Sequence, residues 1–291
     1  MSRFCTLFAL LAMVAFSSAI ASDVGPVPNA VQREFHLAPF YQKYLDLDGM
    51  PIVASGKVSD YALLEAAWTI RHMLPGREDI IHAIAASHIR LSVMAWNEFT
   101  TDIPEHSTLS PQSYWDRRAR GLGATFVRPS SSCAEENLLG YPGDPYRQEN
   151  ILIHEFSHTV HEIGLRTVDR TFDGRLRAAF DAARKAGLWE GTYSSTNHKE
   201  YWAEGAQAWF NAASARVTHG VETREKLKEY DPGLAKLCAE VFGDNDWRYH
   251  RPVDRAPEER THLEGFDASK APRFVWRKDL APDSKGDRVQ P

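Results

Sequence analysis

The stretch NILIHEFSHTVHEIG, residues 150–164, carries three histidines at helical spacing, His154, His158 and His161. Residues four apart lie on one face of an α-helix, about 6 Å apart along its axis, so His154 and His158 can present two imidazole nitrogens to one ion. Zinc binds such nitrogens at about 2.0–2.1 Å. Glu155 follows the first histidine and is placed to act as a general base toward water at the ion. The pattern predicts one wall of a catalytic zinc site.

The third histidine does not complete this site. A zinc ion seated between His154 and His158 lies more than one turn from His161, and three ligands in a row on one straight helix cannot form a tetrahedron. We therefore expect His161 to pack or hydrogen-bond outside the ligand set. The longer metzincin pattern HExxHxxGxxH also fails, because His161 stands where it needs glycine and Gly164 where it needs histidine. The third ligand must come from another part of the chain.

Two carboxylates downstream are candidates for that role. Glu200 and Glu204 lie four residues apart in NHKEYWAEGAQAWF, residues 197–210, which is one of the most apolar helical segments of the chain. Buried carboxylates in such a helix need a cation to compensate them. One can bind the metal while the other reaches the free nitrogen of a ligand histidine and fixes its tautomer. The spacing alone leaves open which carboxylate does which.

Two segments together carry a resemblance to a known family. HEFSH (154–158) and YSSTNHKEYWAE (193–204) resemble the zinc-binding helix and the Tyr…Asn-x-x-Glu segment of gluzincin metallopeptidases of the anthrax lethal factor type. The catalytic fold of that family also occurs in the Pro-Pro endopeptidases. The resemblance covers residues 154–204, and the amino-terminal half has no counterpart in it.

The resemblance implies a role for each matching residue. It implies a bound Zn²⁺ with these residues around it: His154, His158 and Glu200 as ligands, Glu155 as general base, Tyr193 as the residue that stabilises the oxyanion, and Glu204 as a support for the ligand set. His161 has no role in it.

The amino terminus predicts export. Residues 1–21 combine a positive Arg3, an apolar core and the small-residue site Ala19-Ile20-Ala21, as in a secretory signal peptide. The apolar run is shorter than the roughly 20 residues needed to span a bilayer. We therefore expect a secreted, extracellular or periplasmic protein with no membrane partner after signal removal.

The composition limits which classes of partner and which states of the cysteines are expected. A net charge of −5 without a basic cluster argues against nucleic acid, and 43% hydrophobic residues in 291 suffice for one large core. After signal removal Cys133 and Cys238 remain, and we expect either one disulfide or two unpaired buried thiols. A Cys133 thiolate at the metal is disfavoured because better-spaced ligands exist. The oligomeric state is not predicted.

Hydrophobic periodicity predicts an α+β fold, a small mixed or antiparallel sheet packed on the zinc-binding helix and followed by a mainly helical C-terminal lobe. The expected helices are 59–74, 78–86, 147–164 ending at a glycine, 176–188, 197–217, 221–229 and 232–242; the expected strands are 89–96 and 123–128, and the expected loop is 140–146. The expected divisions are a signal peptide (1–21), an extended lead-in or removable pro-segment (22–50), a metallopeptidase domain (51–242) and a surface-wrapping, partly disordered tail (243–291).

The expected function is zinc-dependent hydrolysis of peptide bonds in a protein or peptide substrate, which would pair with the strand at 123–128. Two alternatives stay open. A non-catalytic, zinc-stabilised binding protein would keep the three ligands but could dispense with Glu155 and Tyr193, and both are present. A zinc hydrolase of a non-peptide amide would use the same residues.

Overall fold

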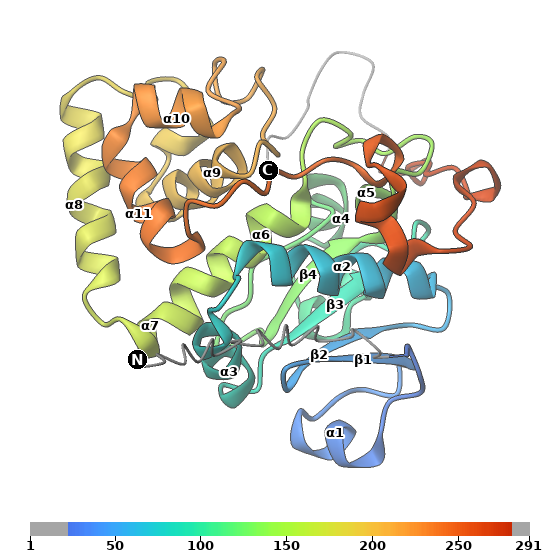
Figure 1. The fold of residues 1–291 in the computed structure, drawn as a ribbon. Coiled ribbons are helices and arrows are strands. Elements are labelled where there is room, and N and C mark those ends of the chain that lie inside the picture. Colours follow the sequence, from blue (N-terminus) through green and yellow to red (C-terminus); the bar gives the residue numbers. More distant parts are fainter. Residues whose placement is uncertain (1–22, 281–291) are drawn as a thin grey trace, which may run out of the picture.

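A four-stranded mixed sheet forms one side of the fold (Figure 1). The structure is a computed structural model that describes residues 23–280. The strands lie in chain order, β1 (Lys43–Leu47), β2 (Met50–Ala54), β3 (Arg90–Met94) and β4 (Ser130–Ala134). The β1–β2 pair is antiparallel, and the β2–β3 and β3–β4 pairs are parallel. The α+β class predicted from the sequence is confirmed.

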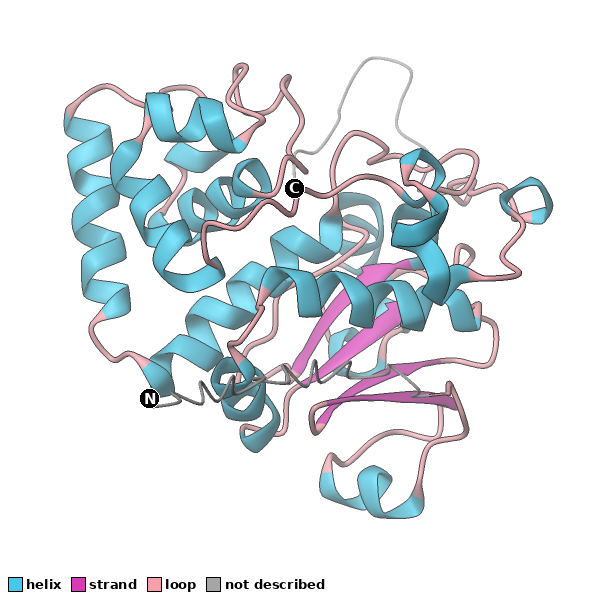
Figure 2. Cartoon of the chain, viewed as in Figure 1, coloured by secondary structure: helices cyan, strands magenta, loops and turns pink. Residues whose placement is uncertain are grey.

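Helices cover the sheet and form a separate group beside it (Figures 1 and 2). Helix α2 packs on β1 and β2, and α6 packs between β4 and α9. The α-helices are α1 (Asn29–Glu34), α2 (Asp60–Met73), α3 (Glu78–Ala86), α4 (Gln112–Arg118), α5 (Glu135–Leu139), α6 (Ile151–Thr159), α7 (Arg166–Val168), α8 (Phe172–Lys185), α9 (His198–Trp209), α10 (Arg224–Tyr230) and α11 (Pro232–Phe242). A π-helix, η3 (Val160–Leu165), joins α6 to α7.

Several predicted elements match the structure closely. The helices expected at 59–74, 78–86 and 232–242 are α2, α3 and α11, and the strand expected at 89–96 contains β3. The boundary expected at residue 50 falls inside the β1–β2 hairpin, where Leu47 pairs with Met50.

The strand predicted at 123–128 is wrong. These residues form a loop, and the isolated bridge from Leu122 to Ser132 lies just before them. Phe126 and Val127 are 59% and 84% exposed, so their β-forming side chains are not packed against a neighbouring strand. The pairing edge that we expected for a substrate is therefore absent at these residues.

The true fourth strand, β4, has the polar sequence SSSCA, and all five residues are buried. Hydroxyl contacts make this burial tolerable: the Oγ atoms of Ser92 and Ser130 lie 2.6 Å apart, and Ser132 Oγ accepts from the Leu122 amide at 3.0 Å. Because alternating hydrophobicity is absent, sequence periodicity could not reveal this strand.

The helix predicted at 147–164 has the predicted length but lies four residues further along the chain. It begins at Ile151, after Asn150 caps it by accepting from the Ile153 amide at 2.9 Å, and continues through η3 and α7 to Val168. Gly164 does not end the helix. A Cβ at this position would stand 2.7 Å from Cγ2 of Ile80 on α3. The glycine permits close packing of two helices. Three further helices also differ from their predicted limits: α8 (expected 176–188), α9 (expected 197–217) and α10 (expected 221–229).

The segment after α11 is fastened to α2 by a buried ion pair. Arg255 donates to both carboxylate oxygens of Glu65 at 2.6 and 2.8 Å, and its guanidinium lies 4.0 Å from the ring centre of Trp68. His262 Nε2 lies 2.8 Å from the same carboxylate. The disorder expected for the last dozen residues falls mainly on residues 281–291, which lie outside the described part of the chain.

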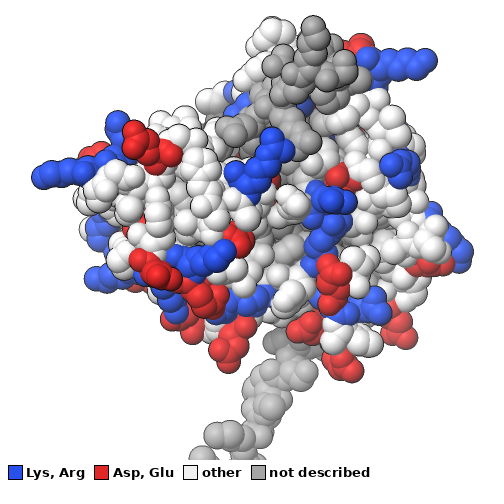
Figure 3. All heavy atoms as spheres, turned by 90° about the horizontal axis from the view of Figure 1, so that it is seen from above, with Lys and Arg blue, Asp and Glu red and all other residues white. Residues whose placement is uncertain are grey.

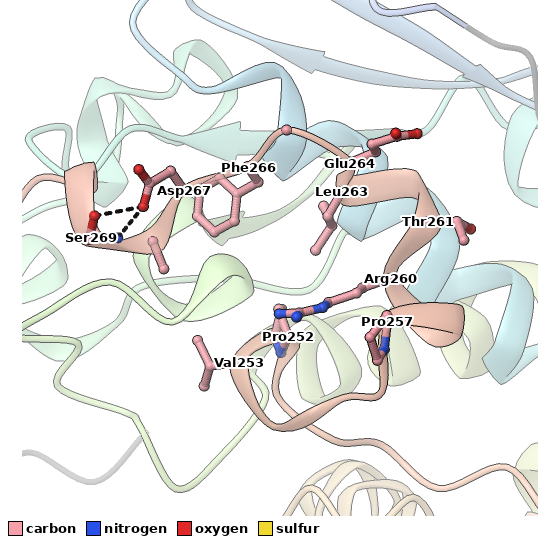
Figure 4. A pocket seen from close by; sticks show the side chains of 12 residues that line it. Pro252, Val253, Pro257, Arg260, Thr261, Leu263, Glu264, Phe266, Asp267 and Ser269 are labelled. Carbon is pink, nitrogen blue, oxygen red and sulfur yellow. Dashed lines mark hydrogen bonds between the residues drawn. The ribbon is translucent and has the colours of Figure 1, made fainter.

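A cavity of about 620 Å³ opens in this C-terminal segment (Figure 4). Pro252, Arg260 and Phe266 lie around it, and Asp267 accepts hydrogen bonds from the amide and hydroxyl of Ser269 beside it. The histidines of the 150–164 segment are not among its lining residues.

Both cysteines of the described chain, Cys133 and Cys238, are free and buried, so the thiol alternative holds and the disulfide does not form. Within residues 23–280, none of the helices has the length and apolar character that crossing a membrane requires. The signal peptide expected at 1–21 lies outside the described residues. Acidic and basic side chains are interspersed over the face seen in Figure 3.

We predict that Gly164→Ala lowers the free energy of unfolding by about 1–2 kcal/mol, because the added methyl overpacks the fully buried, β-branched Ile80. Gly174→Ala, in α8 where an added Cβ meets no atom within 4 Å, is the matched control and should raise stability by up to about 1 kcal/mol. Urea unfolding of both variants measures the difference. Equal or greater stability of the Gly164 variant would contradict the packing role.

Candidate metal centre

The three predicted ligands come from two helices that pack against each other. His154 and His158 lie on α6, and Glu200 lies in the first turn of α9. Asn197 caps α9 by accepting from the amides of Lys199 and Glu200 at 2.9 and 3.1 Å, which fixes the backbone that carries the carboxylate.

Two side-chain hydrogen bonds hold α9 against α6. The Trp202 indole donates to the Ser157 carbonyl at 2.8 Å, and the Gln207 amide donates to the Asn150 carbonyl at 3.1 Å. Trp202 and Gln207 are both buried, so each bond also satisfies a polar group that water does not reach. These two bonds set the position of Glu200 over α6.

The side chains of His154, His158 and Glu200 converge on one point. The two Nε2 atoms lie 3.3 Å apart, and Glu200 Oε2 lies 3.3 Å from His154 Nε2 and 3.2 Å from His158 Nε2. Ligand atoms around a tetrahedral zinc with bonds of about 2.0–2.1 Å are about 3.3 Å from one another. The three edges of this triangle therefore match a zinc site with one position left for a further ligand.

The chemistry of these atoms also fits a cation. Glu200 Oε2 is buried and receives no hydrogen bond, although two imidazole nitrogens lie beside it. Burial opposes ionisation of this carboxyl, but the facing histidines outweigh it and lower the pKa of Glu200, so the oxygen is anionic. Likewise burial lowers the pKa of His154, but the facing carboxylates, Glu200 first, outweigh it and raise that pKa to about 10. The site attracts a positive charge.

The ring of His154 is oriented from behind by Gln207. The Gln207 amide nitrogen is committed to the Asn150 carbonyl, so its oxygen faces His154 Nδ1, at 3.0 Å. The Gln207 oxygen then accepts the Nδ1 proton, and Nε2 is the nitrogen that faces the triangle, where a bound cation would replace its proton. Glu204, expected in this supporting role, lies farther away at 3.5 Å, with its Oε1 without a hydrogen bond. Burial raises the pKa of Glu204 to about 7.

Glu155 is 8% exposed and lies between the histidines along α6. Burial, its first cause, raises the pKa of this carboxyl, while the nearby histidines lower it in part. A carboxyl with a raised pKa is the better proton acceptor.

A glycine loop presses directly on this part of α6. A Cβ at Gly121 would stand 3.1 Å from Cγ of Glu155, and one at Gly123 would stand 2.7 Å from Cβ of His158. Gly121 and Gly123, just before and at the start of the segment predicted as a strand, thus confine the side chains of Glu155 and His158.

Tyr193 lies in a 3₁₀-helix, η4 (Tyr193–Ser195), just before α9, with its ring centre 6.5 Å from that of His154. Arg118, at the end of α4, donates to the Tyr193 hydroxyl at 3.0 Å. Burial and the charge of Glu200 raise the pKa of Tyr193, so the hydroxyl keeps its proton. A phenol and a guanidinium therefore lie together beside the triangle of His154, His158 and Glu200.

His161 lies outside the triangle, on η3, where its Nε2 is 3.0 Å from Oδ1 of Asp173 on α8. A π-helix has a wider turn than an α-helix, so residues after Val160 no longer follow the stripe of α6. His161 consequently faces α8.

Two residues of this site, Gln207 and Arg118, were not predicted from the sequence. Gln207 lies seven residues after Glu200 and three after Glu204, on the same stripe of α9, and this spacing could have indicated it. Arg118 belongs to a different element, 75 residues from Tyr193, and no local pattern signals such a contact.

Comparisons with known proteins give little further information. No protein-family model matches the chain, and no curated protein matches it. Among solved structures, a Pro-Pro endopeptidase from Paenibacillus alvei is similar at a TM-score of 0.39 and 16% identity, over 67% of this chain and 98% of that one. At this level of likeness no residue role is transferred.

We predict that Gln207→Leu lowers zinc affinity about 10- to 100-fold, because His154 loses the acceptor that fixes its tautomer. Gln148→Leu, the same chemical change at an exposed residue, is the control and should leave the affinity unchanged. Competition with a chromophoric chelator measures both. An unaltered affinity in the Gln207 variant would assign the orienting role to Glu204 instead.

Proposed function

We propose that the protein is a secreted zinc-dependent peptidase of the gluzincin type. The observation that carries the proposal is the triangle of His154, His158 and Glu200, whose ligand atoms lie 3.2–3.3 Å apart with Glu155 beside them. A binding protein that used zinc only for stability would need the triangle alone. The buried Glu155 and the Tyr193–Arg118 pair favour an enzyme.

Zinc would be held by His154, His158 and Glu200, and when bound it supplies a Lewis acid that polarises a carbonyl and acidifies water. The remaining chemistry belongs to the protein. Glu155 accepts the proton of the attacking water and passes it to the departing amine nitrogen, a role that suits a carboxyl with a raised pKa.

The Tyr193–Arg118 pair stabilises the negative charge that develops on the carbonyl oxygen. Because Arg118 donates to the Tyr193 oxygen, the phenol hydrogen is free to point to the substrate, and the guanidinium polarises it. One donor of this kind is worth about 10²- to 10³-fold in kcat. The export signal of residues 1–21 remains part of the proposal, and so does the protein or peptide nature of the substrate.

We expect the exported chain to cleave an unfolded protein substrate and Glu155→Gln to abolish this cleavage while zinc stays bound. Tyr193→Phe should lower kcat about 10²-fold or more through the lost donor. Tyr114→Phe, at a half-exposed tyrosine of α4, is the control and should retain full activity. Cleavage is followed on a fluorescent casein together with metal analysis.

Two outcomes distinguish a wrong peptidase proposal from a wrong ligand assignment. If the wild type binds zinc at this centre but cleaves neither protein nor peptide, the peptidase proposal fails, and activity on a non-peptide amide is tested next. If Glu200→Ala binds as much zinc as the wild type, the ligand assignment is wrong instead.

A further inference from the structure

A second cluster of metal-ligating side chains lies beside the candidate centre and shares no residue with it. His161 of η3, Asp173 of α8 and His198, the first residue of α9, bring three ligand atoms within 4.8 Å of one another. The proposed function uses none of these residues.

The distances in this cluster suit a tetrahedral ion. Asp173 Oδ1 lies 3.0 Å from His161 Nε2 and 3.4 Å from His198 Nε2, close to the roughly 3.3 Å between ligand atoms of a zinc site. The two imidazole rings are nearly perpendicular, with centres 5.9 Å apart. Both nitrogens therefore face one carboxylate oxygen from different directions.

One of these nitrogens has no other partner. His198 is only 9% exposed, and its Nε2 is buried and forms no hydrogen bond. This nitrogen is aimed at Asp173. A buried imidazole nitrogen without a partner costs free energy that a metal ion would recover.

Asp173 is oriented for this role by its second oxygen. Oδ2 accepts from Arg177 Nε at 2.8 Å, which leaves Oδ1 directed toward the histidines. The positive charge of Lys199 nearby is offset by its ion pair with Glu162. The carboxylate thus keeps its negative charge available to a cation.

The cluster opens to a cavity of about 740 Å³, which His161 and Asp173 line together with Arg166 and Arg170. Three protein ligands with the fourth position open to solvent are typical of zinc sites that exchange an outer ligand. Glu162 and Asp169 also line this cavity, so its rim carries charges of both signs.

We propose that His161, Asp173 and His198 form a second divalent metal site, selective for zinc-like ions over Mg²⁺ and Ca²⁺ because two of its three ligands are imidazoles. The ion would join η3, α8 and the first turn of α9. Because His198 precedes Glu200 by two residues, occupancy of this site also restrains the helix end that carries Glu200.

The test is zinc stoichiometry by isothermal titration of the full-length exported chain after chelation and removal of the chelator. We expect two equivalents for the wild type. Asp173→Asn and His161→Gln should each keep one, with affinity at the second site reduced at least about 10- to 100-fold. Asp181→Asn, which removes the same charge from an exposed residue of α8, is the control and should keep two.

The variant Glu200→Ala distinguishes the two sites. In it one equivalent should remain, and the double variant Glu200→Ala/Asp173→Asn should bind none. The second site is refuted if Asp173→Asn and His161→Gln bind as much zinc as the wild type, whatever Glu200→Ala does. Failure of Glu200→Ala to lose an equivalent would refute the first site alone. Circular dichroism and thermal unfolding confirm that each variant is folded.

Discussion

The contact between α6 and α9 is the constraint on which the site depends. One helix can supply two imidazoles from its own spacing, but a third ligand at 3.2–3.3 Å requires a second helix held at fixed height and rotation. Trp202 and Gln207 set that position through carbonyl groups of Ser157 and Asn150, and Asn197 fixes the start of α9. Backbone carbonyls do not change with side-chain substitution, so this alignment is insensitive to sequence drift elsewhere on α6.

The charges of the site explain why so many acidic groups can be buried together. Glu155, Glu200 and Glu204 are each largely inaccessible, and desolvation raises the pKa of Glu155 and Glu204. Only Glu200, which faces both histidines, has a lowered pKa. An isolated carboxylate at this depth would be protonated. The proposed zinc ion between the helices would offset this cost, and the folded chain already holds the groups in place.

The sequence indicated those features that depend on local spacing. The i, i+4 pairs on α6 and α9 and the limits of α2, α3 and α11 follow from helical periodicity, and the class of fold follows from them. Features set by distant contacts were not predictable in this way. β4 is stabilised by hydroxyl contacts to other elements, Gly164 by its fit against Ile80, and Arg118 by a partner 75 residues away. At Gly164 the local pattern pointed to a helix end, and at β4 and Arg118 it indicated nothing.

The π-helix η3 has a further consequence for how this chain tolerates insertions and deletions. A π turn holds one residue more than an α turn, so removing one residue between Val160 and Leu165 would restore the α register and rotate everything after it by about 100°. His161 would return to the stripe of His154 and His158, and Gly164 would leave its contact with Ile80. The single extra residue therefore turns His154 and His158 toward Glu200 but His161 toward Asp173 along one continuous helix.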